Sequence, residues 1–473
     1  MRNFIEYMEK NYSPKVPKRA WLPQKKPVIK NGTRIIIVGG GISGSSLARE
    51  LLILATKENI DLEINLVNSN TCNYCGGLIT NLAQGTLEEI YQLSVPRELI
   101  LREVKTCAYV TNEGSVEIDL RKKMIATLRT SKFGILGFDD SIKSRITEGL
   151  GPKAAAMLRV FEPTLVRKIF APEAKEGKWK VRLSRLDPHN RPVELEGDVL
   201  VMASGFKSLN RPMMRDFEQQ TGYSPPPLME ASVTEIYTDE AVTNKMNDQI
   251  LIVDNIVPGA VIAVIPKSDY WVTVTSLGRR LTTSDVDLLF SAEAVKKYLD
   301  LPSASQYLRC KTICPAQVFT GPSRNFYGDG WVAIGDLTGY GRVLKDGYFA
   351  SFWEAQLVAH TLFYHGAQAS DFRRYYHRPL RKFLLDNRFG MWLFKINLRL
   401  GQFPWFRKLL LAVGQLEEER NPAGSFMHSA TRALATGDLS YRLITLFYVL
   451  GFCKAFIRPR ALLSLVRQGP GVS

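Results

Sequence analysis

The segment that most constrains the fold of this chain is TRIIIVGGGISGSSLARELLILAT, residues 33–56. Its β-branched run, residues 35–38, is typical of a buried parallel strand, and a helical pattern of apolar and polar residues follows the glycines. In a G-x-G-x-x-G turn the first glycine makes the tight turn, the second lets backbone approach a pyrophosphate, and the third lets the helix pack on the strand. The helix N-terminus attracts the phosphates. We therefore predict a dinucleotide-binding turn made of Gly39, Gly40, Gly41, Ile42, Ser43 and Gly44.

A second strand is predicted in LEINLVN, residues 62–68. In folds of this kind the end of that strand carries an acid that binds ribose hydroxyls, and here the position holds Asn68. An asparagine still accepts a hydrogen bond from a hydroxyl, but it is neutral and binds more weakly than a carboxylate. No arginine follows directly, so the substitution does not indicate a site for a 2′-phosphate.

Two later segments distinguish a flavin from a nicotinamide. GDVLVMASG, residues 197–205, is a predicted buried strand that runs into Ser204 and Gly205. Residues 329–363 contain another strand that ends in Gly335 and Asp336, then a glycine-rich loop and a long helix that starts near Asp346 and Gly347. Asp336 is suited to accept a ribityl hydroxyl, and the positive end of the helix is suited to stabilise a reduced flavin ring. The order of the three segments predicts bound FAD.

At this point the sequence resembles the geranylgeranyl reductase branch of glutathione-reductase-like flavoproteins, over roughly residues 33–365. Four segments carry the resemblance. They are Gly39, Gly41 and Gly44; Cys75-Gly76-Gly77 after the second strand; PGAVIAVIPKSDYWVTV, residues 258–274; and Gly335-Asp336 with Lys345-Asp346-Gly347. Three positions depart from the family pattern: Asn68 replaces the usual acid, Ser204 stands where related hydroxylases have Asp-Gly, and residues 259–265 lack the aromatic residues of the cavity signature.

The resemblance implies an FAD-dependent oxidoreductase. Its flavin would take hydride from NADPH or another reductant and reduce a carbon–carbon double bond of a prenyl or related lipid substrate. Cofactor contacts would come from the turn at residues 39–44, Asn68, Gly76, Gly77, Ser204, Gly205, Gly335, Asp336 and Gly347, with Cys75 as the catalytic residue. The alternatives are a flavin-dependent monooxygenase or isoprenoid cyclase, and a flavin-binding, membrane-associated protein without turnover.

Cys72 and Cys75 stand two residues apart and allow several interpretations. A zinc site would need two further ligands, and Cys310 and Cys314 are distant in sequence and have no histidine nearby. A redox-active dithiol is a second interpretation, and burial without a function is a third. We favour Cys75 at the mouth of the flavin cavity, with Cys72 incidental, and we predict no metal site.

The charge is unevenly distributed. Lysine and arginine exceed aspartate and glutamate by 62 to 46, a net charge of +16. Residues 1–30 hold eight basic and two acidic side chains, and residues 373–408 hold ten and one. The second segment mixes its basic residues with Trp, Phe and Leu, which is typical of an element at a membrane interface.

No uncharged apolar stretch is long enough to span a bilayer, and no nucleic-acid recognition motif is present. We therefore expect peripheral membrane contact, no nucleic-acid partner, and a cytoplasmic location. The last expectation rests on the six cysteines, which suggest a reducing compartment.

These features predict an α/β protein: a Rossmann-type FAD-binding domain, an antiparallel-sheet substrate domain and a C-terminal helical region. The predicted boundaries are 1–32 for an extended basic tail, 33–215 with 321–365 for the FAD-binding domain, 216–320 for the substrate domain, and 366–473 for the helical region. The oligomeric state is left open.

Overall fold

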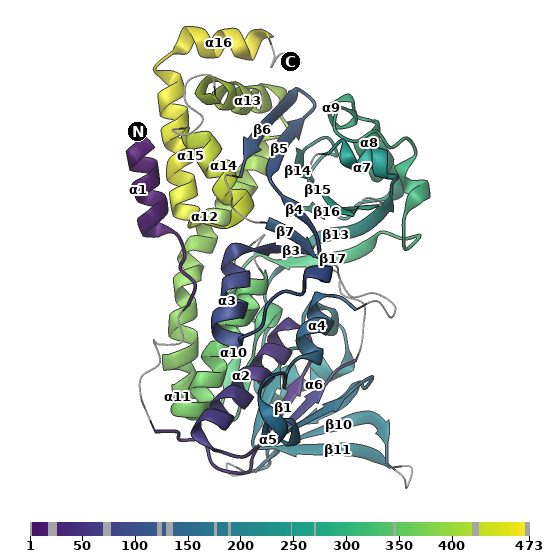
Figure 1. Cartoon of the computed structure of the whole chain (residues 1–473), viewed down its shortest axis with the longest axis vertical. Coiled ribbons are helices and arrows are strands. Elements are labelled where there is room, and N and C mark those ends of the chain that lie inside the picture. The colour runs from purple at the N-terminus through teal and green to yellow at the C-terminus, as the bar shows by residue number, and fades with distance from the viewer. Residues whose placement is uncertain are drawn as a thin grey trace.

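The computed structural model of the chain has three parts. It describes residues 2–17, 26–69, 77–120, 125–128, 136–174, 177–187, 191–246, 248–268, 271–343, 347–418 and 425–468. Figure 1 shows a sheet flanked by helices at the lower end, a second sheet at the upper right, and a column of helices that rises to the upper end. The predicted fold class is confirmed: an α/β domain of the Rossmann type, a largely antiparallel second sheet and a C-terminal helical region.

The lower part is built on a six-stranded sheet with the order β18-β19-β12-β1-β2-β8. Its strands are β1 (Thr33–Val38), β2 (Leu62–Val67), β8 (Leu158–Phe161), β12 (Val199–Met202), β18 (Tyr327–Gly328) and β19 (Trp331–Ala333). β1 pairs in parallel with both β2 and β12, although these strands lie far apart in the sequence. This places β1 at the centre of the sheet, where the Rossmann-type fold changes direction and nucleotides bind.

Helices α2 (Ile42–Glu58) and α10 (Gly347–Tyr364) pack against each other, and α2 also packs on β1 and β2. The core between them is apolar: Ile35, Ile36 and Ile37 of β1 have no exposed surface. Two charged side chains of α2, Arg49 and Glu50, are nonetheless buried. The Arg49 guanidinium of α2 donates to the carbonyl oxygen of Tyr91 at 2.6 Å and to three carbonyls in residues 145–148.

The remaining elements outside the second sheet and the C-terminal region are short. A three-stranded sheet has the order β11-β10-β9, and another has the order β3-β7-β4. The strands are β3 (Leu78–Thr80), β4 (Ile100–Val104), β7 (Ile125–Leu128), β9 (Val166–Phe170), β10 (Trp179–Leu186) and β11 (Pro192–Gly197). The helices are α3 (Asn81–Tyr91), α4 (Phe138–Ser144), α5 (Gly151–Ala156), α6 (Pro212–Thr221) and α11 (Ala369–Asp371).

The second sheet has seven strands in the order β17-β13-β16-β15-β14-β5-β6. They are β5 (Thr106–Thr111), β6 (Gly114–Asp119), β13 (Leu228–Tyr237), β14 (Gln249–Asp254), β15 (Val261–Ser268), β16 (Trp271–Leu277) and β17 (Cys314–Phe319). Helices α7 (Glu240–Asn244), α8 (Thr283–Ser291) and α9 (Glu293–Lys296) accompany it. The sequence assigned residues 33–215 to the first domain, but β5 and β6 extend this second sheet, because β5 pairs in parallel with β14.

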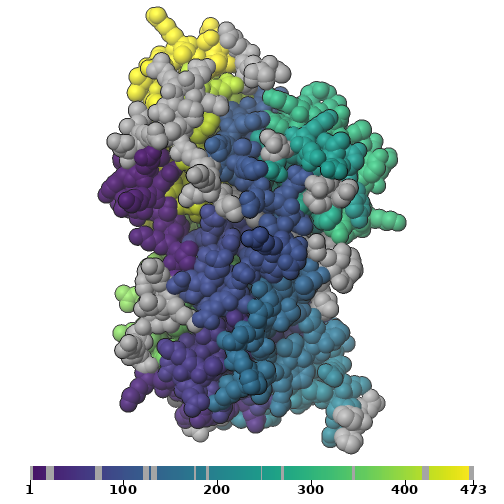
Figure 2. Space-filling model, in the orientation of Figure 1, coloured from purple at the N-terminus to yellow at the C-terminus, as the bar shows by residue number. Residues whose placement is uncertain are grey.

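The C-terminal region is a column of helices: α12 (Arg378–Leu400), α13 (Pro404–Glu418), α14 (Phe426–Thr436), α15 (Tyr441–Phe456) and α16 (Pro459–Gln468). The N-terminal segment joins this column and is not the extended tail predicted from its lysines and prolines. Residues Arg2–Tyr12 form helix α1, with Ile5 fully buried among apolar side chains of the column and Glu9 paired with Arg432 of α14. Figure 2 shows this N-terminal helix, in purple, on the surface beside the C-terminal residues.

Polar contacts attach the column to the second sheet. Arg407 of α13 donates from Nη2 to Oε1 of Glu113 at 2.6 Å, and both side chains are less than a tenth exposed. Asn397 of α12 donates to the buried carboxylate of Asp254, which also accepts from the Tyr109 hydroxyl at 2.6 Å. Within the described ranges, no helix has the length and apolar character needed to cross a membrane.

Candidate functional site

The turn between β1 and α2 packs so tightly that two of its glycines cannot carry a side chain. A Cβ on Gly39 would lie 2.3 Å from the carbonyl oxygen of Ala203, and Gly39 has φ +115°, in the left-handed region. A Cβ on Gly44 would lie 1.9 Å from the carbonyl oxygen of Gly39. The turn is thus closed against the end of β12 and against its own helix, as predicted for the first and third glycines of the motif.

Gly41 differs from these two glycines. A Cβ at Gly41 would meet nothing within 4 Å, and its φ of −75° is ordinary. Gly41 is the N-cap of α2, and no side chain caps the helix there. Ile42 and Ser43 are less than a tenth exposed. The open surface here is therefore backbone at a helix N-terminus, the arrangement that binds phosphate groups.

Two other segments reach the same place. A Cβ on Gly335 would lie 2.3 Å from the hydroxyl oxygen of Ser43, so the turn after β19 touches the start of α2. A Cβ on Gly205 would lie 3.7 Å from Oδ2 of Asp336, which brings the turn after β12 beside that carboxylate. Gly205 and Gly335 both have positive φ, +64° and +69°. Residues predicted from three separate motifs thus lie together at the carboxyl edge of the sheet.

Asp336 is exposed to solvent, although protein is densely packed around it. Its side chain is exposed, yet desolvation by its surroundings raises its pKa to about 6. Such a carboxyl group accepts hydrogen bonds well from a ligand hydroxyl that displaces water. Ser204, by contrast, turns away from this face: its hydroxyl lies 2.8 Å from that of Ser208.

A buried carboxyl group beneath this turn was not predicted from the sequence. Oε2 of Glu354, in α10, accepts from the backbone N–H of Gly335 at 2.8 Å and lies 3.0 Å from the Tyr376 hydroxyl, and Oε1 lies 2.9 Å from the Thr338 hydroxyl. Burial raises the pKa of Glu354 to about 8. The only sequence signal was a glutamate amid the apolar residues of the helix at 347–364.

The hydrogen-bond pattern agrees with a protonated Glu354. The hydroxyls of Thr338 and Tyr376 also contact the carbonyl oxygens of Gly335 and Ala333, each at 2.9 Å. Two hydroxyl protons cannot serve both carbonyls and both carboxyl oxygens. A proton on Glu354 supplies one more donor, so the side chain holds the 335–338 turn as a neutral acid.

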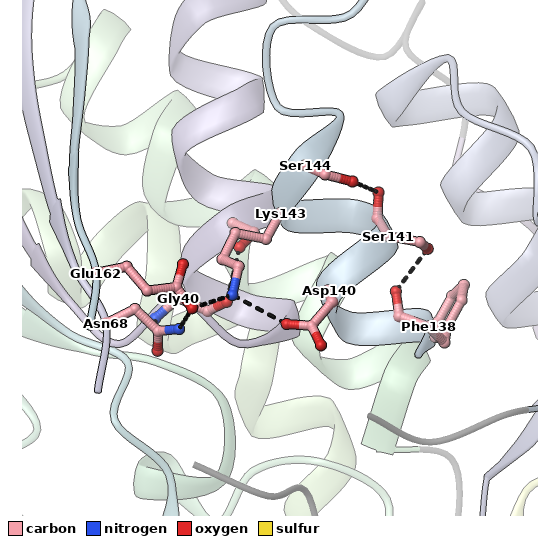
Figure 3. A network of polar contacts seen from close by, with 9 residues as sticks. Gly40, Asn68, Phe138, Asp140, Ser141, Lys143, Ser144 and Glu162 are labelled. Atoms are coloured by element: carbon pink, nitrogen blue, oxygen red, sulfur yellow. Dashed lines mark hydrogen bonds and ion pairs between the residues drawn. The ribbon is translucent and has the colours of Figure 1, made fainter. Parts of the chain in front are cut away.

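Asn68 lies at the end of β2, as predicted. Its Oδ1 accepts from the backbone N–H of Gly40 at 3.2 Å, and its Nδ2 donates to Oε1 of Glu162 at 3.0 Å. The same Glu162 oxygen accepts from Nζ of Lys143 at 2.6 Å. Figure 3 shows this network, which joins the glycine turn to α4 through the ends of β2 and β8.

Two residues of the predicted site, Cys75 and Gly76, lie outside the described residues, as do Cys72 and Asp346. Gly77 is described, has φ +62°, and accepts through its carbonyl oxygen from Nζ of Lys267 at 3.0 Å. Lys267 is fully buried in β15 and also donates to the carbonyl of Leu128 at 2.9 Å. The sequence did not single out this lysine, which ties the second sheet to the stretch that follows the cysteines. Gly347 is the exposed first residue of α10.

The metal prediction can be compared only in part. In the ranges that the structure describes, no group of three or more His, Cys, Asp or Glu side chains could hold a metal ion. Cys72 and Cys75, half of the zinc site that the sequence allowed, are not among those residues. The prediction of no metal therefore stays a prediction.

Solved structures with a similar fold are flavoproteins. A geranylgeranyl bacteriochlorophyll reductase-like protein from Thermoplasma acidophilum superimposes with a TM-score of 0.54 at 13% identity, over 92% of this chain and 99% of that one. A flavoprotein/dehydrogenase from Cytophaga hutchinsonii gives 0.56 at 13% identity, over 92% and 98%. A flavin-dependent brominase gives 0.56 at 13% identity, over 90% and 100%. No family model and no curated protein sequence matches the chain. The chain therefore has the fold of flavin-dependent oxidoreductases, and the individual reaction is not decided by it.

Proposed function

We propose that this protein is an FAD-dependent oxidoreductase that reduces carbon–carbon double bonds of a prenyl or related lipid substrate. The observation that carries the proposal is the meeting of three turns, at Gly39–Gly44, Ser204–Gly205 and Gly335–Asp336, at one edge of the sheet. Sequence motifs far apart in the chain predicted the same three turns. The fold shared with reductase-like and dehydrogenase flavoproteins supports it further.

The residues present fit an FAD molecule. The uncapped N-terminus of α2 at Gly41 is suited to the pyrophosphate, since no side chain fills that space. Asp336 is suited to accept a ribityl hydroxyl, and the N-terminus of α10 near Gly347 to face the flavin ring. The neutral Glu354 holds the 335–338 turn without placing a second negative charge beside Asp336.

Bound FAD would supply the hydride for one carbon of the double bond, taken first from NADPH or another reductant. The neighbouring carbon then needs a proton, and we assign its delivery to Cys75, directly or through an ordered water. Cys75 follows the second strand in sequence and precedes two glycines that permit close backbone approach.

The first alternative is a flavin-dependent monooxygenase or isoprenoid cyclase. The fold supports a monooxygenase as well as it supports a reductase, since a p-nitrophenol 4-monooxygenase also shares it. The other is a flavin-binding membrane protein without turnover.

The deciding experiment is an absorption spectrum of the purified protein, followed by anaerobic addition of NADPH with a prenyl substrate. We expect a yellow protein that releases FAD on heating. NADPH should bleach the flavin absorbance, and adding the lipid in the absence of oxygen should restore it. A colourless protein that takes up no FAD would contradict the proposal, and reoxidation that requires oxygen would favour the monooxygenase.

Two cysteine variants test the proton donor. Cys75→Ser should leave FAD bound and reducible but slow its reoxidation by the lipid by about 10²-fold or more, as expected for loss of a general acid. Cys72→Ser is the matched control and should change little. Equal losses in both, or release of a stoichiometric metal by either, would mean that the two cysteines act as a unit.

We also propose peripheral contact with an anionic membrane surface in a reducing compartment such as the cytoplasm. Exposed side chains recur along α12 at helical spacing, with three apolar residues flanked by basic ones: Arg381, Leu385, Phe389, Trp392, Lys395 and Arg399. A second stripe runs along the neighbouring α15, from Arg442 through Leu446 and Val449 to Phe456. Apolar side chains beside basic ones are suited to bind lipid tails and headgroups together.

A further inference from the structure

The amide of Asn68 is held on both sides by the protein itself. Its oxygen accepts from Gly40 of the glycine turn at 3.2 Å, and its nitrogen donates to Oε1 of Glu162 at 3.0 Å. The residue that replaces the usual ribose-binding acid therefore acts as a bridge between the glycine turn and a carboxylate on the next strand.

Glu162 comes immediately after β8, and β8 pairs with β2 so that Phe161 stands opposite Val67. Two backbone hydrogen bonds continue the pairing past both strands, from Asn68 N–H to the Phe161 carbonyl at 3.0 Å and from Thr164 N–H to the Asn68 carbonyl at 2.8 Å. Glu162 therefore stands beside Asn68 at the carboxyl edge of the sheet, where nucleotides bind in folds of this type.

Lys143 fixes the carboxylate of Glu162. Its ammonium donates to Oε1 of Glu162 at 2.6 Å and to Oδ1 of Asp140 at 2.9 Å, and its side chain is 13% exposed. Burial lowers the pKa of Lys143, but the hydrogen bonds and charges of the two carboxylates outweigh burial and leave that pKa raised. The lysine therefore places a positive charge against the side chain of Glu162.

Both hydrogen bonds that Glu162 accepts, from Asn68 and from Lys143, are made to its Oε1 atom. Figure 3 shows Lys143 and Asn68 converging on the same carboxylate. The side chain is one-fifth exposed, and Oε2 makes no hydrogen bond or ion pair among the residues that the structure describes. An anchored carboxylate with one oxygen available is the group that accepts a charge-assisted hydrogen bond from a sugar hydroxyl.

We propose that Glu162, oriented by Asn68 and Lys143, supplies the carboxylate that binds the adenosine ribose hydroxyls of the dinucleotide. In this chain the ribose-binding acid thus stands at the end of β8 and not at the end of the adjacent β2. This assignment rests on the proposed FAD binding. It makes Glu162 a cofactor-binding residue, with Asn68 and Lys143 as positioning residues.

The test compares Glu162→Gln with the native full-length chain by competition of ADP, 2′-deoxy-ADP and 3′-deoxy-ADP against FAD uptake. The native protein should prefer ADP over at least one deoxy analogue by about 10-fold or more, the range of a hydrogen bond to a charged group. Glu162→Gln should weaken ADP binding by about 10- to 100-fold and abolish that preference. Glu194→Gln is the control: Glu194 is also ion-paired, with Arg182, but lies on β11 away from the glycine turn.

A second variant protects the test against misfolding. Asn68→Asp combined with Glu162→Gln returns the acid to β2 and keeps an amide beside a carboxylate, and it should restore the preference for ADP. Equal weakening of ADP and both deoxy analogues in Glu162→Gln would overturn the assignment, because a structural role does not distinguish the sugars. Tighter native binding of 2′,5′-ADP than of 5′-AMP would also overturn it, since Lys143 would then bind a phosphate. A native chain that takes up no FAD would contradict the proposed function itself, whereas normal FAD uptake by Glu162→Gln would contradict this assignment alone.

Discussion

The nucleotide-binding end and the C-terminal helical column are both held together by segments distant in sequence, but by different contacts. At the lower end, glycine backbone makes the close contacts: Gly39 lies against the backbone of Ala203, and Gly335 lies against the side chain of Ser43. In the column, side-chain charges make the connection, with Arg407 on Glu113 and Arg432 on Glu9. Backbone contacts at such distances admit only glycine, whereas charged pairs leave the neighbouring sequence free to vary.

The difference explains why the two regions should respond differently to the same substitution. An added methyl group at Gly39 or Gly44 has no space, while at Gly414 of the column it meets side chains at ordinary distances. The predictions below use this contrast, in order of decreasing effect.

The largest effect is expected from Gly44→Ala in α2. Its Cβ would lie 1.9 Å from the Gly39 carbonyl, so the turn must open, at a cost of about 3 kcal/mol or more. The matched variant in the column is Gly414→Ala in α13, where the Cβ would lie 3.5 Å from a methyl carbon of Val116. Because alanine favours a helix interior over glycine by about 1 kcal/mol, this variant should be neutral or slightly stabilised. Urea unfolding of both variants measures the two changes in stability. Similar losses of stability in the two variants would contradict the difference between the regions.

Gly41→Val separates binding from folding. A Cβ at Gly41 meets no protein atom within 4 Å, so the variant should unfold at nearly the native urea concentration. The valine side chain would occupy the space proposed for the pyrophosphate, and FAD uptake should be lost. Retention of FAD would show that the phosphates do not lie over this turn.

Glu113→Gln should weaken the attachment of the column by about 3 kcal/mol, because it leaves the Arg407 guanidinium buried without its charge partner. FAD affinity should be unchanged. The pair Arg407→Met with Glu113→Leu removes both charges and should recover most of the loss. Hydrogen exchange of α13, compared with that of α2, measures the effect. A loss of protection that is greater in α2 would contradict the separation of the two regions.

The same pair makes the column sensitive to acid. Burial raises the pKa of Glu113, but the hydrogen bond and charge of Arg407 outweigh it and leave the pKa lowered. A lowered carboxyl pKa adds stability above its ordinary value of 4.5, and that stability is lost as the pH falls through the folded value. The pKa shift of Glu354 has the opposite sign. With its pKa raised to about 8, its contribution is complete below the ordinary value of 4.5 and declines as the pH rises toward 8.

Glu354→Gln should therefore remove a stability decline between about pH 4.5 and 8 that the native protein shows. Stability measured by urea unfolding across this range, as the difference between native and variant, cancels the contribution of Asp336. A constant difference would mean that Glu354 does not titrate there.

The smallest effect concerns the exposed stripe of α12. Trp392→Ala removes a side chain that is 54% exposed and should weaken sedimentation with anionic vesicles by about tenfold without altering stability. Leu186→Ala, 51% exposed on β10 at the opposite end, is the control and should bind as the native chain does. High salt should release much of the native protein, because the Debye length falls to about 3 Å at 1 M. Equal binding to neutral and anionic vesicles at all salt concentrations would contradict the proposal.

Much of the nucleotide-binding end was predictable from local sequence. The strands at 35–38 and 62–67, the glycine turn, and the strands that precede Ser204 and Gly335 lie where the sequence predicted them. The reason is physical: a turn with backbone contacts near 2 Å from the ideal Cβ position requires glycine, and a strand buried on both faces requires a continuous apolar run.

The tertiary structure decided what residue type alone could not. The lysines and prolines of residues 1–32 predicted an extended tail, but the burial of Ile5 against the column stabilises a helix at Arg2–Tyr12. Strand β5 pairs with β14, which lies more than 130 residues later in the chain, and this pairing brings β5 and its neighbour β6 into the second sheet. Asn68 looked like a weakened ribose ligand, and the structure set Glu162 and Lys143 beside it. Glu354, Lys267 and Glu162 are ordinary charged residues in the sequence, and their environment arises only when distant segments pack around them. Sequence determines which backbone turns are possible, whereas the surroundings of a buried charge depend on long-range packing.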